Sequence, residues 1–149
     1  MKADFGDFIF FRDDSLLSRM IRFFDGRSDS GHVGMILGTF EKRILFVESN
    51  WKGVDVGMLN ERRQNFEILP CPLKPVQPLE KILDEVAKKY DVRHFFWTGM
   101  NKFSLGLVKP PPTDDEAYIC SELVNWIYGY QLSPKGEATP HSIYMFVKK

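Results

Sequence analysis

The uneven distribution of proline constrains the fold of this chain more than any other feature of its sequence. The first 69 residues contain no proline, and all nine prolines lie from Pro70 onward. Proline has no backbone N–H and disfavours helix in the residue before it, so the clusters at 70–78 and 110–112 indicate connectors. We therefore expect most of the strands in the proline-free block and most of the helices after it.

Short runs of apolar and β-branched residues predict five strands. They span residues 8–11, 32–37, 44–48, 54–56 and 66–69. We expect the second and third strands to form a hairpin around Thr39–Glu41. In the predicted register Glu48 lies opposite His32, and both side chains share one face of the sheet. A slip of one residue would send them to opposite faces.

Apolar residues at helical spacing and capping residues predict the helices. These span residues 15–24, 78–90, part of 117–128 and a short segment from Thr139. Thr113 and Glu116 resemble a capping box for the third helix, and Thr139-Pro140 is typical of the start of the last. Strands early and helices late favour an α+β fold over alternating βαβ units. The length suits a single domain over residues 1–149.

Composition excludes several classes of protein. Lysine plus arginine and aspartate plus glutamate are balanced at 20 each, so we expect no nucleic acid partner. The apolar runs are too short to span a bilayer, and the N-terminal residues lack the apolar region of a secretory signal. The two cysteines, Cys71 and Cys120, argue against a disulfide scaffold and favour a reducing compartment. We therefore expect a cytoplasmic protein without a transmembrane segment.

Three residues predict a nucleophilic site if the fold brings them together. Cys120 lies near the start of a predicted helix, where the helix dipole favours a thiolate. His32 begins a strand and would serve as the base that activates the thiol. If the hairpin register holds, Glu48 accepts a hydrogen bond from His32 and fixes its tautomer.

Each of these residues also has an ordinary structural explanation. A free cysteine on an apolar helix face is commonly a small core residue, and a lone histidine or glutamate at a strand end commonly has no catalytic role. The contact between Glu48 and His32 is the geometry that separates the two interpretations. The three histidines, His32, His94 and His141, have no ligand spacing with either cysteine, so we expect no metal site.

Six short motifs occur in an order that resembles a known family. They are Gly6-Asp7-Phe8-Ile9-Phe10-Phe11-Arg12, Gly31-His32-Val33-Gly34-Met35-Ile36-Leu37, Val47-Glu48-Ser49, Tyr90-Asp91, Tyr118-Ile119-Cys120-Ser121-Glu122-Leu123-Val124 and Thr139-Pro140. From about residue 6 to about residue 143, the chain resembles the circularly permuted NlpC-type papain-like cysteine hydrolases, in particular their YiiX-like branch. This resemblance implies a small papain-like α+β domain. In it a bent antiparallel sheet packs against helices, and the catalytic cysteine opens a helix.

The resemblance also implies roles for individual residues. Cys120 would be the nucleophile, His32 the base and Glu48 the third polar residue. Tyr118 matches an aromatic position just before the cysteine, and its hydroxyl or the Cys120 backbone N–H would help to form an oxyanion hole. The related lecithin–retinol acyltransferase-like enzymes carry an Asn-Cys-Glu-His type of motif. Ile119-Cys120-Ser121-Glu122 departs from that motif, which favours the YiiX-like branch.

The predicted function is a cysteine hydrolase, amidase- or peptidase-like, that cleaves an amide or ester through an acyl-cysteine intermediate and needs no cofactor. Its substrate would be a small-molecule, peptide or lipid amide. Phe95, Phe96 and Trp97 would line the substrate site, although such an aromatic run also suits a protein core. Two alternatives stay open: a lipid-type acyltransferase or thioesterase on the same fold, and a non-catalytic binding module that retains it.

Overall fold

The computed structural model describes residues 3–12, 19, 22–23, 30–59, 65–86, 88–90, 117–135 and 137–149. The predicted helix over 15–24 falls largely outside these residues, although Arg19, Arg22 and Phe23 are helical. The aromatic run at 95–97 and the capping box of Thr113 and Glu116 also lie outside them. Within the described part of the chain, no helix has both the length and the apolar character needed to cross a membrane.

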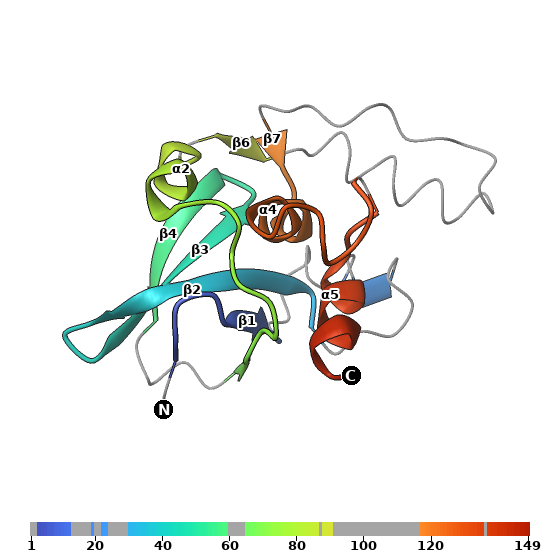
Figure 1. Cartoon of the computed structure of the whole chain (residues 1–149), viewed down its shortest axis with the longest axis horizontal. Coiled ribbons are helices and arrows are strands. Elements are labelled where there is room, and N and C mark those ends of the chain that lie inside the picture. The colour runs from blue at the N-terminus through green and yellow to red at the C-terminus, as the bar shows by residue number, and fades with distance from the viewer. Residues whose placement is uncertain are drawn as a thin grey trace.

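The fold is α+β, with one five-stranded antiparallel sheet (Figure 1). Its strands are β1 (Phe8–Phe11), β2 (His32–Phe40), β3 (Arg43–Asn50), β4 (Gly53–Leu59) and β5 (Phe66–Leu69). They follow the spatial order β4-β3-β2-β1-β5, so β1 pairs with both β2 and β5. The five predicted strands are therefore confirmed, and three of them are longer than their apolar runs indicated.

The predicted register of the β2–β3 hairpin is wrong by two residues. Glu48 pairs with Gly34, not with His32, so Glu48 and His32 are diagonal neighbours. The turn lies at Glu41–Lys42, beyond the predicted Thr39–Glu41, and both of its residues have positive φ, at 47° and 64°. Such turns are usually marked by Asn or Gly, and neither is present here. The register also shifts at a bulge between Ile36 and Gly38.

Because the error is an even number of residues, it leaves each side chain on its predicted face. His32 and Glu48 still share a face of the sheet, and a contact between them is possible across the diagonal. The part of the prediction on which the site depends is therefore retained, although the pairing itself is different.

The helices with bounds in the described part of the chain are α2 (Leu79–Asp84), α4 (Cys120–Ile127) and α5 (Pro140–Val147). Helix α2 is shorter than predicted, α4 lies within the predicted 117–128, and α5 begins directly after Thr139 as predicted. The predicted helix over 78–90 ends at Asp84, because the chain then forms β6 (Lys89–Tyr90), which pairs in parallel with β7 (Ala117–Tyr118). Ala117–Tyr118 is thus strand rather than helix. The predicted cap of the last helix is confirmed: Thr139 accepts a hydrogen bond from the Ser142 N–H at 3.1 Å, and Pro140 follows it.

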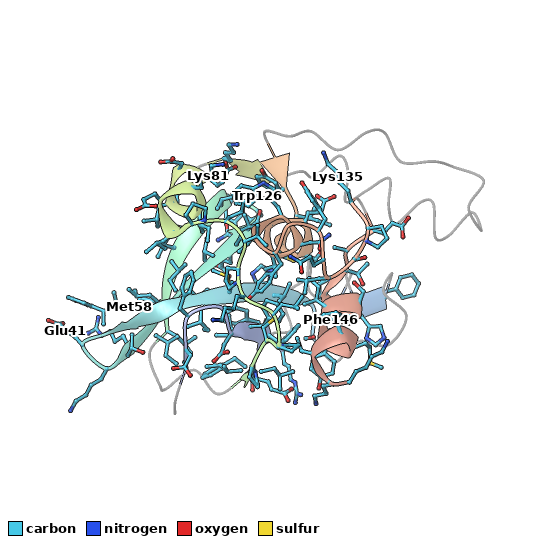
Figure 2. All side chains as sticks on the ribbon, viewed as in Figure 1. Glu41, Met58, Lys81, Trp126, Lys135 and Phe146 are labelled. Carbon is cyan, nitrogen blue, oxygen red and sulfur yellow. The ribbon has the colours of Figure 1, made fainter. Side chains whose placement is uncertain are left out.

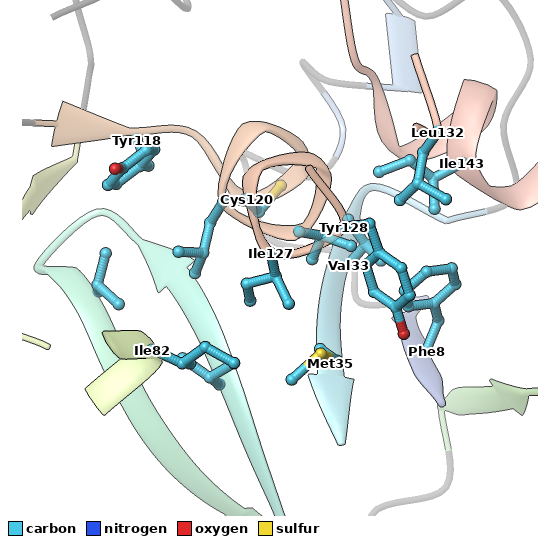
Figure 3. Packing of buried hydrophobic residues seen from close by; sticks show 14 of the residues in the cluster. Phe8, Val33, Met35, Ile82, Tyr118, Cys120, Ile127, Tyr128, Leu132 and Ile143 are labelled. Carbon is cyan, nitrogen blue, oxygen red and sulfur yellow. The ribbon is translucent and has the colours of Figure 1, made fainter. Parts of the chain in front are cut away.

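Alternate residues of the strands build two apolar clusters on opposite faces of the sheet. Helix α4 packs over β2 and β3 on the first face, and Figure 3 shows the Ile127 side chain pointing from α4 toward the sheet. The first cluster also includes Phe8, Phe10, Cys120, Leu123, Tyr128 and Ile143. The second comprises Ile9, Phe11, Ile36, Ile44, Phe46 and Leu59. In Figure 2 the turn with Glu41 projects away from α2, α4 and α5.

Candidate active site

Cys120 is the first residue of α4. Ile119 precedes it in an extended conformation, and the Ile119 carbonyl accepts the first hydrogen bond of the helix, from the Leu123 N–H at 3.0 Å. The Glu122 carboxylate accepts a hydrogen bond from the Ile119 N–H at 3.3 Å. The start of the helix is therefore well defined. The thiol lies in the first turn of α4, at the positive end of the helix dipole.

His32 and Glu48 form a direct contact. His32 Nε2 lies 2.7 Å from Glu48 Oε2, within hydrogen-bond and ion-pair distance. Their side chains are 14% and 19% exposed, so solvent screens the pair only partly. The imidazole also lies 5.5 Å from the Phe11 ring, measured between centroids, which limits its movement on one side. The predicted carboxylate–histidine contact is present.

His32 also lies near enough to Cys120 for the two groups to interact electrostatically. Burial lowers the pKa of the His32 imidazole, but the charge of the Cys120 thiolate, a hydrogen bond to that sulfur and the Glu48 carboxylate raise it more strongly, to about 10. Because Nε2 faces Glu48, Nδ1 is the ring nitrogen that remains for Cys120. The imidazole thus bridges sulfur and carboxylate.

The side chains of Cys120 and His32 approach each other from opposite faces of the sheet. Cys120 belongs to the first apolar cluster, whereas His32 has the same alternation along β2 as Ile36 of the second cluster. Both are the first residues of their elements, so they meet at the end of the sheet. Long-range folding, and no local motif, creates this contact.

Asn50 is a site residue that the sequence analysis missed. Its side-chain Nδ2 donates to Glu48 Oε1 at 3.0 Å, on the oxygen that does not face His32. Its Oδ1 accepts from the Lys52 N–H at 2.9 Å, within the turn between β3 and β4. An Asn before a tight turn is a common turn residue, so the sequence alone indicated only the turn.

Ser49 is a second residue that the sequence analysis missed. It is fully buried, and its Oγ donates to the Tyr118 carbonyl oxygen at 2.6 Å. Tyr118 lies two residues before Cys120, so this hydrogen bond ties the approach to α4 directly to β3. Glu48, Ser49 and Asn50 are consecutive, and each has a contact at or beside the site.

The other predicted site residues have different placements. The Tyr118 side chain packs against Trp126, with ring centroids 6.0 Å apart, and in Figure 3 its ring points away from the Cys120 sulfur. The residues predicted to line a substrate site, 95–97, lie outside the described part of the chain. Cys71 is half-buried and far along the chain from Cys120, and both cysteines are free thiols.

The arrangement brings a thiol, an imidazole and a carboxylate together at one end of the sheet. Among the described residues, no group of three or more His, Cys, Asp or Glu side chains is suited to hold a metal ion. Comparison with models of known protein families and with curated proteins found no match to this chain.

Proposed function

We propose that this protein is a cysteine hydrolase that cleaves an amide or ester through an acyl-cysteine intermediate. One observation carries the proposal: His32 Nε2 lies 2.7 Å from the Glu48 carboxylate, and the nearby Cys120 thiolate raises the pKa of the same imidazole. This is the relation of nucleophile, base and orienting carboxylate that defines a catalytic triad by its geometry.

The chemistry proceeds in two halves. In the first, His32 takes the Cys120 proton, the thiolate attacks the substrate carbonyl, and His32 returns the proton to the departing amine or alcohol. In the second, His32 takes a proton from water, the resulting hydroxide attacks the thioester, and the acid leaves as the thiol is restored. Glu48 keeps the imidazole oriented and stabilises its positive charge in both halves.

The backbone N–H of Cys120 is the better candidate for the oxyanion donor. It lies in the first turn of α4, where backbone N–H groups lack partners within the helix. Because the Tyr118 ring points away from the sulfur in Figure 3, its hydroxyl would have to move to contribute. The Tyr118 hydroxyl is therefore only the second candidate for the oxyanion donor in the proposal.

Further parts of the proposal rest on the resemblance. We infer the permuted papain-like arrangement, in which the strand with the base precedes the helix with the nucleophile, and this chain has that order. The substrate is a peptide, small-molecule or lipid amide, and the predicted role of 95–97 in binding it stays a prediction. Two free thiols suit a reducing compartment, so the cytoplasm stays our predicted location.

The burial of Cys120 favours one rival, a non-catalytic module that retains the fold. Cys120 is only 2% exposed, as expected for an inert core thiol. Catalysis and labelling of the thiol therefore both require part of this cover to open in the folded protein. The acyltransferase alternative uses the same acyl-cysteine and differs only in the acceptor, so adding competing amines and alcohols to a turnover assay distinguishes it from a hydrolase.

The proposal is tested by the pH dependence of iodoacetamide labelling, followed for each cysteine by peptide mass spectrometry. Cys71 is an internal reference, because burial raises the pKa of its thiol. We expect the Cys120 rate to stay nearly flat from pH 6 to pH 8, while the Cys71 rate rises about tenfold for each unit of pH increase. The Glu48→Gln variant should remain folded, and its Cys120 labelling rate should no longer be constant between pH 6 and pH 8.

Two results would contradict the proposal. One is a Cys120 labelling rate that decreases as the pH is lowered, in parallel with that of Cys71. The other is a Cys120 thiol that stays unlabelled at every pH in the folded protein. Either result would identify Cys120 as a core thiol and favour the non-catalytic module.

A further inference from the structure

We propose that Asn50 is a positioning residue of this site, which holds the Glu48 carboxylate in the orientation that accepts from His32. The inference rests on the proposed function, since it assigns a role within the same site. It is carried by two hydrogen bonds of one side chain, to Glu48 Oε1 at 3.0 Å and from the Lys52 N–H at 2.9 Å.

The Asn50 amide is fixed at both ends. The Lys52 N–H can only donate, so the atom facing it must be the amide oxygen, and the amide nitrogen must then face Glu48. The turn between β3 and β4 thus determines which end of the amide reaches the site. Asn50 is the last residue of β3, so its backbone is also held by pairing with Gly53.

Glu48 has a physical need for such a donor. Its Oε2 faces His32, and Asn50 engages the other oxygen, so both oxygens of a carboxylate that is only 19% exposed have a donor. Asp55 is its cross-strand partner in β4, and like charges directly opposite each other repel. A neutral donor on the same side offsets that repulsion without adding a charge.

The contacts form one chain, from the Lys52 backbone through Asn50, Glu48 and His32 to Cys120. With both oxygens engaged, the carboxylate has little freedom to rotate away from Nε2. The Nε2 proton then stays on the side of Glu48, which leaves Nδ1 for the sulfur. Asn50 acts on the nucleophile only through these two residues.

The test compares Asn50→Ala with Asn50→Ser in the labelling experiment at pH 6 and pH 9. A serine hydroxyl can still accept from the Lys52 N–H and support the turn, but it is too short to reach Glu48. We expect both variants to lower the Cys120 rate at pH 6 by about three- to tenfold, the scale of one weakened charge-assisted hydrogen bond. At pH 9 the rates should converge, because the thiol then ionises without help.

The matched control is Lys52→Ala, which keeps both hydrogen bonds of Asn50 and should match the parent at both pH values.

A second measurement tests whether Asn50 acts through Glu48. In a Glu48→Gln background, Asn50→Ala should have no further effect on the rate at pH 6. The proposal is overturned if Asn50→Ser labels like the parent, which would show that only the turn matters, or if the two substitutions have independent effects. If the parent itself shows no flat range between pH 6 and pH 8, the proposed function fails first. If the parent has a constant Cys120 labelling rate between pH 6 and pH 8 and Asn50→Ala has the same rate, the proposed function stands and the role of Asn50 is refuted.

Discussion

At the scale of single residues, the role of each side chain in the candidate site depends on the side chains around it. Cys120, His32 and Glu48 each had an ordinary structural explanation in the sequence, and their mutual contacts favour the catalytic one. The His32–Glu48 contact was predictable because a base and an acid on one face of a hairpin are recognisable residue types, and the catalytic roles of the three residues stay a prediction. Asn50 and Ser49 were not predictable, because polar residues near a turn are common, and only the fold shows where their hydrogen bonds lead.

The protonation of His32 gives a prediction at this scale. Its pKa is raised to about 10, so the imidazolium should persist well above pH 8, whereas an ordinary histidine titrates near 6.5. Because the folded pKa lies above the unfolded one, the stability that this group contributes is fully present below about pH 6.5 and is lost as the pH rises through 10. NMR titration of ¹³C-labelled histidine measures the first effect.

Urea unfolding of the parent and of His32→Gln between pH 6 and pH 10.5 measures the second effect. The difference in free energy of unfolding between the two proteins should shrink as the pH rises. A His32 midpoint near 6.5, or a difference that grows with pH, would contradict the prediction.

At the scale of elements, the sequence predicted where strands and helices exist better than where they end. Strand positions follow from apolar runs, and the cap at Thr139 follows from side-chain chemistry that acts within four residues. The end of α2 at Asp84 does not, since it depends on the pairing of β6 with a strand far along the chain. The hairpin register failed for a similar reason, because a bulge and a turn without Gly or Asn carry no local signal.

Close packing between β3 and β4 gives a prediction at this scale. A Cβ added at Gly57 would lie 2.3 Å from Phe46 Cζ, and Phe46 is a buried member of the second cluster. Gly57→Ala should therefore lower the free energy of unfolding by about 1–3 kcal/mol, the usual cost of overpacking. Urea denaturation of Gly57→Ala, Phe46→Leu and the double variant measures it. The double variant should be more stable than the sum of the single effects, and strict additivity would show that the two sites do not collide.

At the scale of the whole molecule, the site exists because the sheet and α4 are joined at one end. Residues from β2, β3 and the approach to α4 meet there, although they are far apart in the sequence. The order of strands and helices, and hence the α+β class, was predictable from the distribution of proline. The junction itself was not, because it is created by contacts between distant residues.

The hydrogen bond from Ser49 to the Tyr118 carbonyl tests this junction. Ser49→Ala leaves that buried carbonyl without its donor, so we expect a loss of about 1–3 kcal/mol in the free energy of unfolding. We also expect slower labelling of Cys120 at pH 6, since α4 is no longer held against β3. Thr139→Ala is a control of similar size, about 1 kcal/mol for a lost N-cap, and should leave the labelling unchanged. Equal labelling in both variants would show that Ser49 stabilises the fold without positioning the nucleophile.

The parallel pairing of β6 with β7 has a consequence for the placement of α4. Strand β7 ends at Tyr118, two residues before Cys120, so the pairing of β6 with β7 fixes the point in space from which the helix starts. The Ser49 hydrogen bond to Tyr118 holds the same point from β3. A slip of β7 by one residue along β6 would therefore carry Cys120 about 3.3 Å along the strand direction and out of alignment with His32.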